Sequence, residues 1–146
     1  MISADTNLFI YAADPDAPQH QAARRFFADL RQGAMEFVLC ELVLVEIYLL
    51  LRNPAVFRTP YTAQVAADYC QALRRCPDWR CVDYAPEVSA RLWPWAGATT
   101  RGYRAIVDAR LALTLRHHGV TQFASANGAD FEGFGFERVW NPLVGQ

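Results

Sequence analysis

Residues 1–14, MISADTNLFIYAAD, place a cluster of polar residues between two apolar stretches. Met1 to Ala4 is typical of a short buried strand, and Asp5 follows it directly. One explanation of Asp5 is local: aspartate is favoured as the N-cap of a helix, and the following NLFIYAA can form one. The other explanation is a functional site, which requires that further carboxylates arrive at the same place in the fold.

The rest of the chain alternates between short strands and longer helices. Further strands are predicted at EFVLC (36–40), RCVDY (80–84) and VTQFAS (120–125), with a candidate fifth at ERVW (137–140). Helices are predicted at residues 19–32, 41–52, 61–75 and 104–118, with a short one that Pro86 opens and Pro94 breaks. Strands that alternate with helices indicate an α/β protein whose sheet is covered on both faces. We therefore expect a three-layer α/β/α sandwich with a mainly parallel sheet of four to five strands, formed by one domain over residues 1–146.

The composition is that of a globular protein, with 53% hydrophobic and 20% charged residues. A formal net charge of −1 gives no bulk attraction to nucleic acid. All 14 basic residues are arginine, a good bidentate phosphate binder, but a sequence-wide bias in genome composition explains this more simply. The four cysteines lack zinc-ligand spacing, and no stretch predicts a signal peptide or a membrane span. We therefore expect a cytoplasmic protein with free thiols.

Polar side chains follow three of the predicted strands at the point where each strand ends. Ligands of parallel α/β sheets bind beyond the carboxyl ends of the strands, so these side chains would share one edge. The group consists of Asp5 after the first strand, Glu41 and Glu46 after the second, and Ser125, Asn127 and Asp130 after the fourth. Glu41 also has a local explanation, because the helix dipole favours an acid in the first turn.

Glu46 is difficult to explain locally, because apolar residues surround it in ELVLVEIYLLL. A helix that is apolar on all sides is expected to be buried. A buried and unpaired carboxylate costs several kcal/mol or shifts its pKa. The two economical explanations are therefore an arginine partner and a metal ion.

Asp108 lies in AIVDARLAL, where an exposed ion pair with Arg104 is one explanation and a site is another. Asn127 and Asp130 lie in NGAD, which is also an ordinary turn sequence. Each position thus has a local explanation, but three acids and an asparagine at one edge would form an oxygen-rich pocket. Hard oxygen ligands favour magnesium or manganese.

The ordered set SADTNLFIYA, LVLVEIYLLL, VDARLAL and FASANGADFEGF resembles the PIN-domain ribonucleases, and most closely the VapC-type toxins of bacterial toxin–antitoxin pairs. The resemblance extends over nearly the whole chain, to the closing WNPL. It implies a PIN-like α/β/α sandwich and a Mg²⁺ or Mn²⁺ site that cuts RNA phosphodiester bonds. It also implies a VapB-type antitoxin, a homodimer and a transfer or ribosomal RNA substrate.

The resemblance assigns roles to particular residues. Asp5, Glu46 and Asp108 match the three main acids that hold the metal. Asn127 falls where many members have a fourth acid and toxins often have asparagine, and Asp130 matches the aspartate that follows; which of the two completes the site is open. Thr6 and Asn7, beside the first acid, and Ser125, before the last loop, are expected to contact the substrate.

RNA would need cationic contacts outside the acidic edge. Arg101 and Arg104, at the start of the Asp108 helix, are the candidate phosphate ligands, against the alternative that both are ordinary surface arginines. Two other functions remain open. A haloacid-dehalogenase-type phosphatase would need Asp at position 7 and a lysine, and the chain has Asn7 and no lysine. A PIN-like module that only binds RNA or protein is disfavoured by the three main acids.

Overall fold

The computed structural model describes residues 1–145 and shows a five-stranded parallel sheet in the order β3-β2-β1-β4-β5. The strands are β1 (Ile2–Ala4), β2 (Phe37–Cys40), β3 (Trp79–Val82), β4 (Gln122–Ala124) and β5 (Arg138–Trp140). The predicted α/β class and the three-layer sandwich are confirmed, and the candidate fifth strand is present. The last residue of the predicted domain, Gln146, lies outside the described residues.

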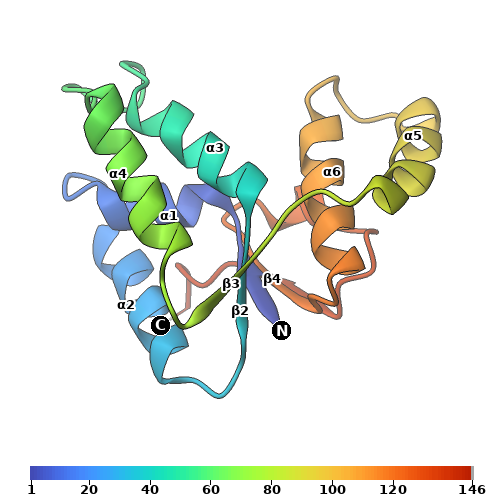
Figure 1. Ribbon diagram of the computed structural model, residues 1–146, viewed down its shortest axis with the longest axis horizontal. Coiled ribbons are helices and arrows are strands. Elements are labelled where there is room, and N and C mark those ends of the chain that lie inside the picture. The colour runs from blue at the N-terminus through green and yellow to red at the C-terminus, as the bar shows by residue number, and fades with distance from the viewer. Residues whose placement is uncertain (146) are drawn as a thin grey trace.

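Helices cover both faces of the sheet (Figure 1). One layer contains α1 (Thr6–Ala13), α2 (His20–Gln32), α3 (Glu41–Leu51) and α4 (Ala63–Arg74). The other contains α5 (Ser89–Ala98), preceded by the 3-10 turn η1 (Pro86–Val88), and α6 (Ala105–His117); a second 3-10 turn, η2 (Gly128–Phe131), follows β4. None of the helices in the described part of the chain is long and apolar enough to cross a bilayer.

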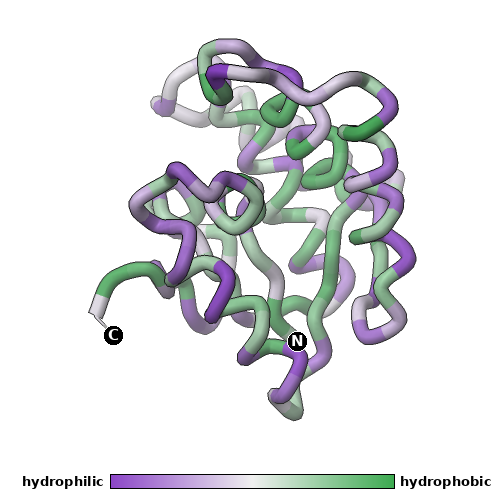
Figure 2. Tube along the Cα trace, turned by 90° about the vertical axis from the view of Figure 1, so that its left-hand side faces the viewer, coloured by the Kyte–Doolittle hydropathy of each residue, from purple (hydrophilic) through white to green (hydrophobic). Residues whose placement is uncertain are grey.

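The central strands β1 and β2 are short, apolar and completely buried, as expected for a sheet covered on both faces, whereas the edge strands β3 and β5 each carry an exposed arginine. A cluster of aromatic rings, Phe9, Phe27, Phe37 and Trp79, joins α1 and α2 to β2 and β3. The hydropathy trace shows the same division, with apolar segments running through the sheet and polar segments on the outer turns (Figure 2).

Gly119 follows the end of α6. Its φ of +85° is a left-handed conformation that glycine adopts without strain. A Cβ at this position would lie 2.7 Å from Cε of Met1, so the turn is also closely packed against the first residue of the chain. A residue with a side chain would therefore be strained here and would also collide with Met1, whereas glycine lets the chain turn from α6 towards β4.

Two local predictions are wrong. Pro94 does not break its helix, because α5 continues through it to Ala98. A proline there removes one backbone hydrogen bond, to the carbonyl of Ala90, and both residues are exposed, so water can satisfy that carbonyl. The α3 helix is not buried on all sides either, since Val45 is 55% and Leu49 is 60% exposed.

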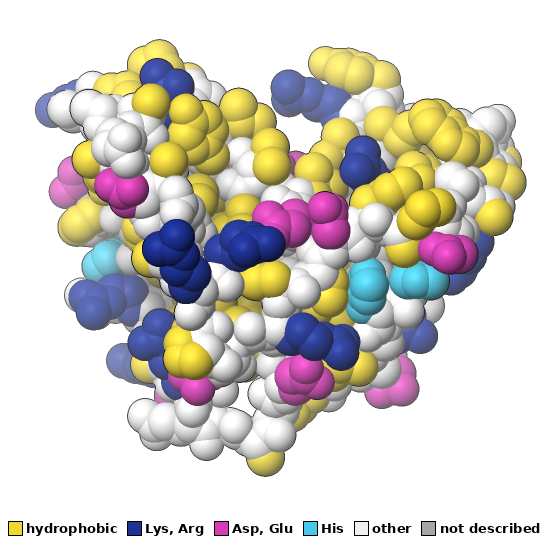
Figure 3. Space-filling view, in the orientation of Figure 1, with side chains coloured by type: hydrophobic (Ala, Val, Ile, Leu, Met, Phe, Trp, Pro, Cys, Tyr) yellow, Lys and Arg dark blue, Asp and Glu magenta, His cyan; other side chains and the backbone are white. Residues whose placement is uncertain are grey.

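The register of the sheet determines which residues meet at its carboxyl edge. Ala4 of β1 lies opposite Ala124 of β4, so the residues that follow them, Asp5 and Ser125, are also adjacent. The backbone N–H of Asp5 donates to the carbonyl of Ala124 at 2.8 Å, which continues the ladder one residue further. The space-filling view shows a hollow between the two helical layers, at the top of the view, on the side of the molecule where α6 begins (Figure 3).

Candidate active site

Asp5 is both a helix cap and a member of the site. It is the N-cap of α1, and its Oδ1 accepts a hydrogen bond from the backbone N–H of Thr6 at 2.8 Å. Its Oδ2 accepts a second one from the Ser125 hydroxyl, also at 2.8 Å. The side chain is only 8% exposed, and this burial raises its pKa although the two donors act in the opposite direction. The carboxylate is therefore held in one orientation at the end of β1.

Thr6 connects Asp5 to Glu46. Its hydroxyl donates to Oε2 of Glu46 at 2.6 Å, across the contact between α1 and α3. Burial also raises the pKa of Glu46, and the nearby charge of Asp5 raises it further. Among residues 1–145 the ion pairs are Arg74 with Glu41 and Arg80 with Glu36, so the arginine partner considered for Glu46 is absent.

Asp108 approaches from α6, on the opposite face of the sheet. Burial and the negative charges of Asp5, Asp130 and Glu46 together raise its pKa to about 6, with Arg101 acting in the opposite direction. Acids from three other segments are therefore close enough to Asp108 for their negative charges to raise its pKa. The ion pair with Arg104 is not formed within the described chain, which leaves the site as the better explanation of Asp108.

The loop after β4 completes this edge. The Ser125 hydroxyl, which donates to Asp5, also accepts from the backbone N–H of Asn127 at 3.0 Å. Asn127 is the residue before η2, and both Asn127 and Asp130 have exposed side chains. Asn7 is half-buried within α1.

Thr6 and Ser125 differ from the prediction that they contact the substrate. Both are buried, with 4% and 0% exposure, and their hydroxyls donate to Glu46 and Asp5. In this structure they position carboxylates and are covered from solvent. The sequence placed both residues in the site, but their local spacing gave no indication of which acid each would contact.

The guanidinium of Arg101, a predicted phosphate ligand, is already engaged in contacts within the protein. Its guanidinium donates to the backbone carbonyls of Asp130 at 2.6 Å and Glu132 at 3.0 Å, and lies over the ring of Phe134. It thereby ties the loop after α5 to η2. Arg104 is exposed at the start of α6. The two arginines line a cavity of about 550 Å³, together with Gly102, Tyr103, Ala105, Asp108 and Asp130.

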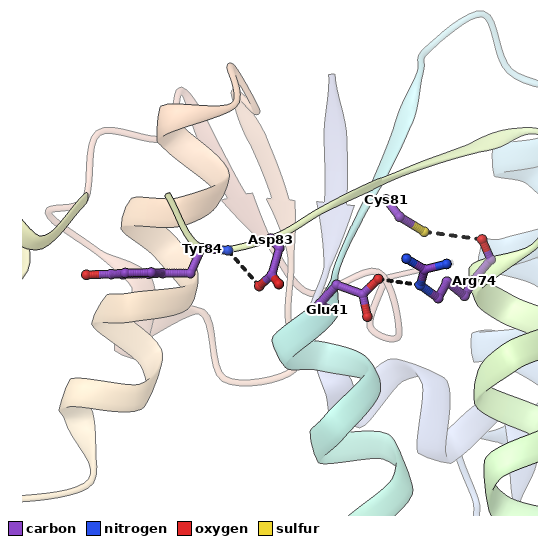
Figure 4. A network of polar contacts seen from close by, with 5 residues as sticks. All are labelled: Glu41, Arg74, Cys81, Asp83 and Tyr84. Atoms are coloured by element: carbon purple, nitrogen blue, oxygen red, sulfur yellow. Dashed lines mark hydrogen bonds and ion pairs between the residues drawn. The ribbon is translucent and has the colours of Figure 1, made fainter. Parts of the chain in front are cut away.

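Glu41 belongs to a separate polar network (Figure 4). It is paired with the Arg74 side chain of α4, whose backbone carbonyl accepts from the Cys81 thiol at 3.3 Å. Asp83 in the same view accepts from the backbone N–H of Tyr84 at 2.7 Å. The pairing of Glu41 agrees with its local explanation and distinguishes it from Glu46 on the same helix.

The acids come to one edge without closing around one point. No group of three or more acidic, histidine or cysteine side chains in residues 1–145 is arranged to hold a metal ion by itself. Magnesium rarely requires such a cage, because it is usually bound by one or two carboxylates, with water and substrate phosphate as its other ligands. Several carboxylates with raised pKa values fit a divalent cation of this kind, since Asp5 and Glu46 have no basic partner among residues 1–145.

The raised pKa values predict how the stability of the metal-free protein depends on pH. The pKa of Asp108 is about 6 in the folded protein and 3.8 ordinarily, so between these values the folded state binds more protons than the unfolded chain. Lowering the pH from 7 towards 5 should therefore stabilise wild type relative to Asp108→Asn, which has no such proton to gain. The measurement is the melting temperature of both proteins in EDTA across this range. A difference that stays constant or changes in the opposite direction would contradict the prediction.

A parallel α/β/α sandwich with carboxylates converging from β1, α3, α6 and the loop after β4 defines the class of protein. The PIN domain model matches residues 2–137, and the chain belongs to the PIN-domain family. The resemblance predicted from the sequence is confirmed.

Individual relatives extend the comparison. The chain is 46% identical over 144 residues to Ribonuclease VapC24 of Mycobacterium tuberculosis, covering 99% of this chain and 98% of the relative. The fold is similar to that of VapC20 from the same species, described as a sarcin-ricin loop cleaving toxin, with a TM-score of 0.71, 23% identity and coverage of 93% and 96%. It is also similar to VapBC2 from Rickettsia felis bound to a promoter DNA fragment, with a TM-score of 0.60, 13% identity and coverage of 97% and 98%.

Proposed function

We propose that this protein is a Mg²⁺- or Mn²⁺-dependent endoribonuclease that hydrolyses RNA phosphodiester bonds, and that it is the toxin of a type II toxin–antitoxin pair. The observation that carries the proposal is that Asp5, Glu46 and Asp108 come from three different elements to one edge of the sheet, where each has a raised pKa. The name of the 46% identical relative, a ribonuclease, supports the same activity. Membership of the PIN family removes the phosphatase alternative.

The residues of the chain would divide the work in the following way. Asp5 and Asp108 would hold the cation from the two sides of the edge, with Glu46 beside them. A bound divalent cation supplies positive charge for the scissile phosphate and activates water for attack on it. Ser125 and Thr6 keep Asp5 in position, and the Thr6 hydroxyl does the same for Glu46. Asn127 and Asp130, both exposed beside these acids, could complete the cation's surroundings or orient water.

The backbone of the RNA would be held by cationic groups at the rim. Arg104 is the more available of the two predicted phosphate ligands, because the carbonyls of Asp130 and Glu132 already occupy donors of Arg101. Arg101 retains its positive charge close to Asp108 and can still attract phosphate at longer range. Transfer or ribosomal RNA remains the proposed substrate class.

A protein partner is part of the proposal. The exposed Val45 and Leu49 of α3 are large apolar side chains on a helix that the sequence predicts to be buried. Beside them, an apolar groove of about 290 Å³ runs between α3 and α4. Contiguous apolar surface of this kind is typical of protein interfaces. We assign it to a VapB-type antitoxin or to the second subunit of a homodimer.

Chelation tests the proposed activity. Purified protein should cleave bacterial total RNA in Mg²⁺ or Mn²⁺ and lose the activity in EDTA. Without the cation nothing at the acidic edge offsets the negative charge of the carboxylates and the phosphate, and no metal activates the attacking water. Activity should return when Mn²⁺ is added in excess of the chelator. Cleavage that persists undiminished in EDTA would contradict a metal-dependent mechanism. A protein that takes up no Mn²⁺ and cleaves no RNA would instead be the binding module considered as the alternative.

A further inference from the structure

Tyr103 is a large aromatic side chain that is almost fully exposed to solvent. It lies in the loop between α5 and α6, is 89% exposed, and lines the 550 Å³ cavity that also contains Asp108 and Asp130. A cavity of this size is in the range that accommodates a small ligand or one unit of a polymer. An exposed aromatic ring next to the acidic edge is not required by the packing of the domain.

The loop that carries Tyr103 is fastened at its start. Arg101 donates to the backbone carbonyls of Asp130 and Glu132, and its own backbone N–H donates to the Thr99 hydroxyl at 3.1 Å. At the other end the loop leads directly into α6, where the N–H of Ala105 donates to the carbonyl of Gly102 at 3.0 Å. A ring presented by an anchored loop loses little conformational freedom when it binds.

The charges around Tyr103 favour nucleic acid. Arg101 and Arg104 lie on either side of it in the sequence, and all three residues line the same cavity. Guanidinium groups bind phosphate, and tyrosine rings stack on nucleobases. Asp108 and Asp130, which line the same cavity, are among the acids assigned above to the bound cation and its surroundings. Aromatic and cationic groups therefore share a cavity with acids of the site, and a nucleotide next to the scissile phosphate can bind there.

We propose that Tyr103 is a substrate-binding residue whose ring stacks on an unpaired nucleobase adjacent to the scissile phosphate. The inference rests on the proposed ribonuclease function and specifies one residue that would contact the substrate beside the cut. A base inside a duplex is already stacked on both faces and cannot lie on the ring, whereas a base in a loop, bulge or end can. Stacking tolerates any base, so the contact would select an unpaired position more than a sequence.

The test uses the full chain and a labelled single-stranded oligoribonucleotide that contains a cut site mapped with wild type. Tyr103→Ala should raise KM about tenfold with little change in kcat, because stacking stabilises the bound substrate and the transition state equally. Tyr103→Phe should resemble wild type. Trp93→Ala is the matched control, since Trp93 is 62% exposed but does not line the cavity, and its KM should not change.

A second comparison identifies the base itself. Removing the base at one position next to the cut should raise KM for wild type by a similar factor and should have no further effect on Tyr103→Ala. Independent effects that multiply would overturn the stacking contact. The same conclusion would follow if Tyr103→Phe were as impaired as Tyr103→Ala, because the hydroxyl and not the ring would then be responsible.

The remaining outcomes separate this inference from the function on which it rests. If wild type cleaves RNA and Tyr103→Ala has an unchanged KM, the inference fails and the ribonuclease function stands. If that variant also binds a VapB-type antitoxin more weakly than wild type does, Tyr103 is a protein contact instead. If wild type cleaves no RNA in Mn²⁺, the proposed function and the inference fail together.

Discussion

Replacing Asp5 by asparagine should reduce RNA cleavage by about a thousandfold or more and leave the fold unchanged. The loss follows from removing one of the carboxylates assigned to the cation, whose charge stabilisation contributes several kcal/mol to such a reaction. The fold should survive because the amide can replace both structural contacts of Asp5. Its oxygen can accept from the backbone N–H of Thr6, and its NH₂ group can donate to the Ser125 hydroxyl. Asparagine is also as good an N-cap as aspartate.

The measurement is the initial rate of RNA cleavage in saturating Mn²⁺, together with the melting temperature of each protein. Asp16→Asn provides a matched control, because Asp16 is an exposed aspartate beyond the end of α1 and outside the acidic edge. It should cleave RNA at the wild-type rate. An Asp5→Asn protein that is folded and retains activity within about tenfold of wild type would remove Asp5 from the catalytic machinery.

The sequence was sufficient to predict the carboxyl edge of the sheet. Short apolar strands followed directly by polar residues indicate both a parallel sheet and the end at which ligands bind. The register then brings Asp5 beside Ser125 without any further assumption. For Glu46 and Asp108 the sequence also allows an ion pair with an arginine, so the resemblance to the PIN family is needed to assign both to the same site.

Other features depended on contacts that residue patterns do not contain. The hydrogen bond between Thr6 and Glu46 spans 40 positions, and the one between Arg101 and Asp130 spans 29. Apolar periodicity likewise predicted that α3 was buried, whereas Val45 and Leu49 are exposed, because a pattern cannot show whether an apolar face is covered by the same chain. The continuation of α5 through Pro94 depended on whether water could reach one carbonyl.

Replacing Glu46 by glutamine should separate activity from stability at one residue. Activity should fall by on the order of a hundredfold or more, because the side chain loses the charge with which it supports the cation. The metal-free protein should be as stable as wild type or more stable. Glutamine keeps the shape and can still accept from the Thr6 hydroxyl, and it removes a charge whose pKa is raised by burial and by Asp5. The Glu46 charge that supports activity would then lower the stability of the metal-free protein.

The melting temperatures of wild type and Glu46→Gln in EDTA distinguish a role of Glu46 in stability from a role at the bound cation. Glu41→Gln is the control on the same helix: Glu41 is paired with the exposed Arg74, so its replacement should hardly change the melting temperature and should leave cleavage intact. Were Glu46 a structural residue whose charge is needed by a buried partner, its replacement would cost about 3–5 kcal/mol. For a protein of this size that corresponds to a fall of roughly 10–16 °C. Such a fall would assign Glu46 to the stability of the fold, whereas an unchanged or higher melting temperature with lost activity would assign its charge to the bound cation.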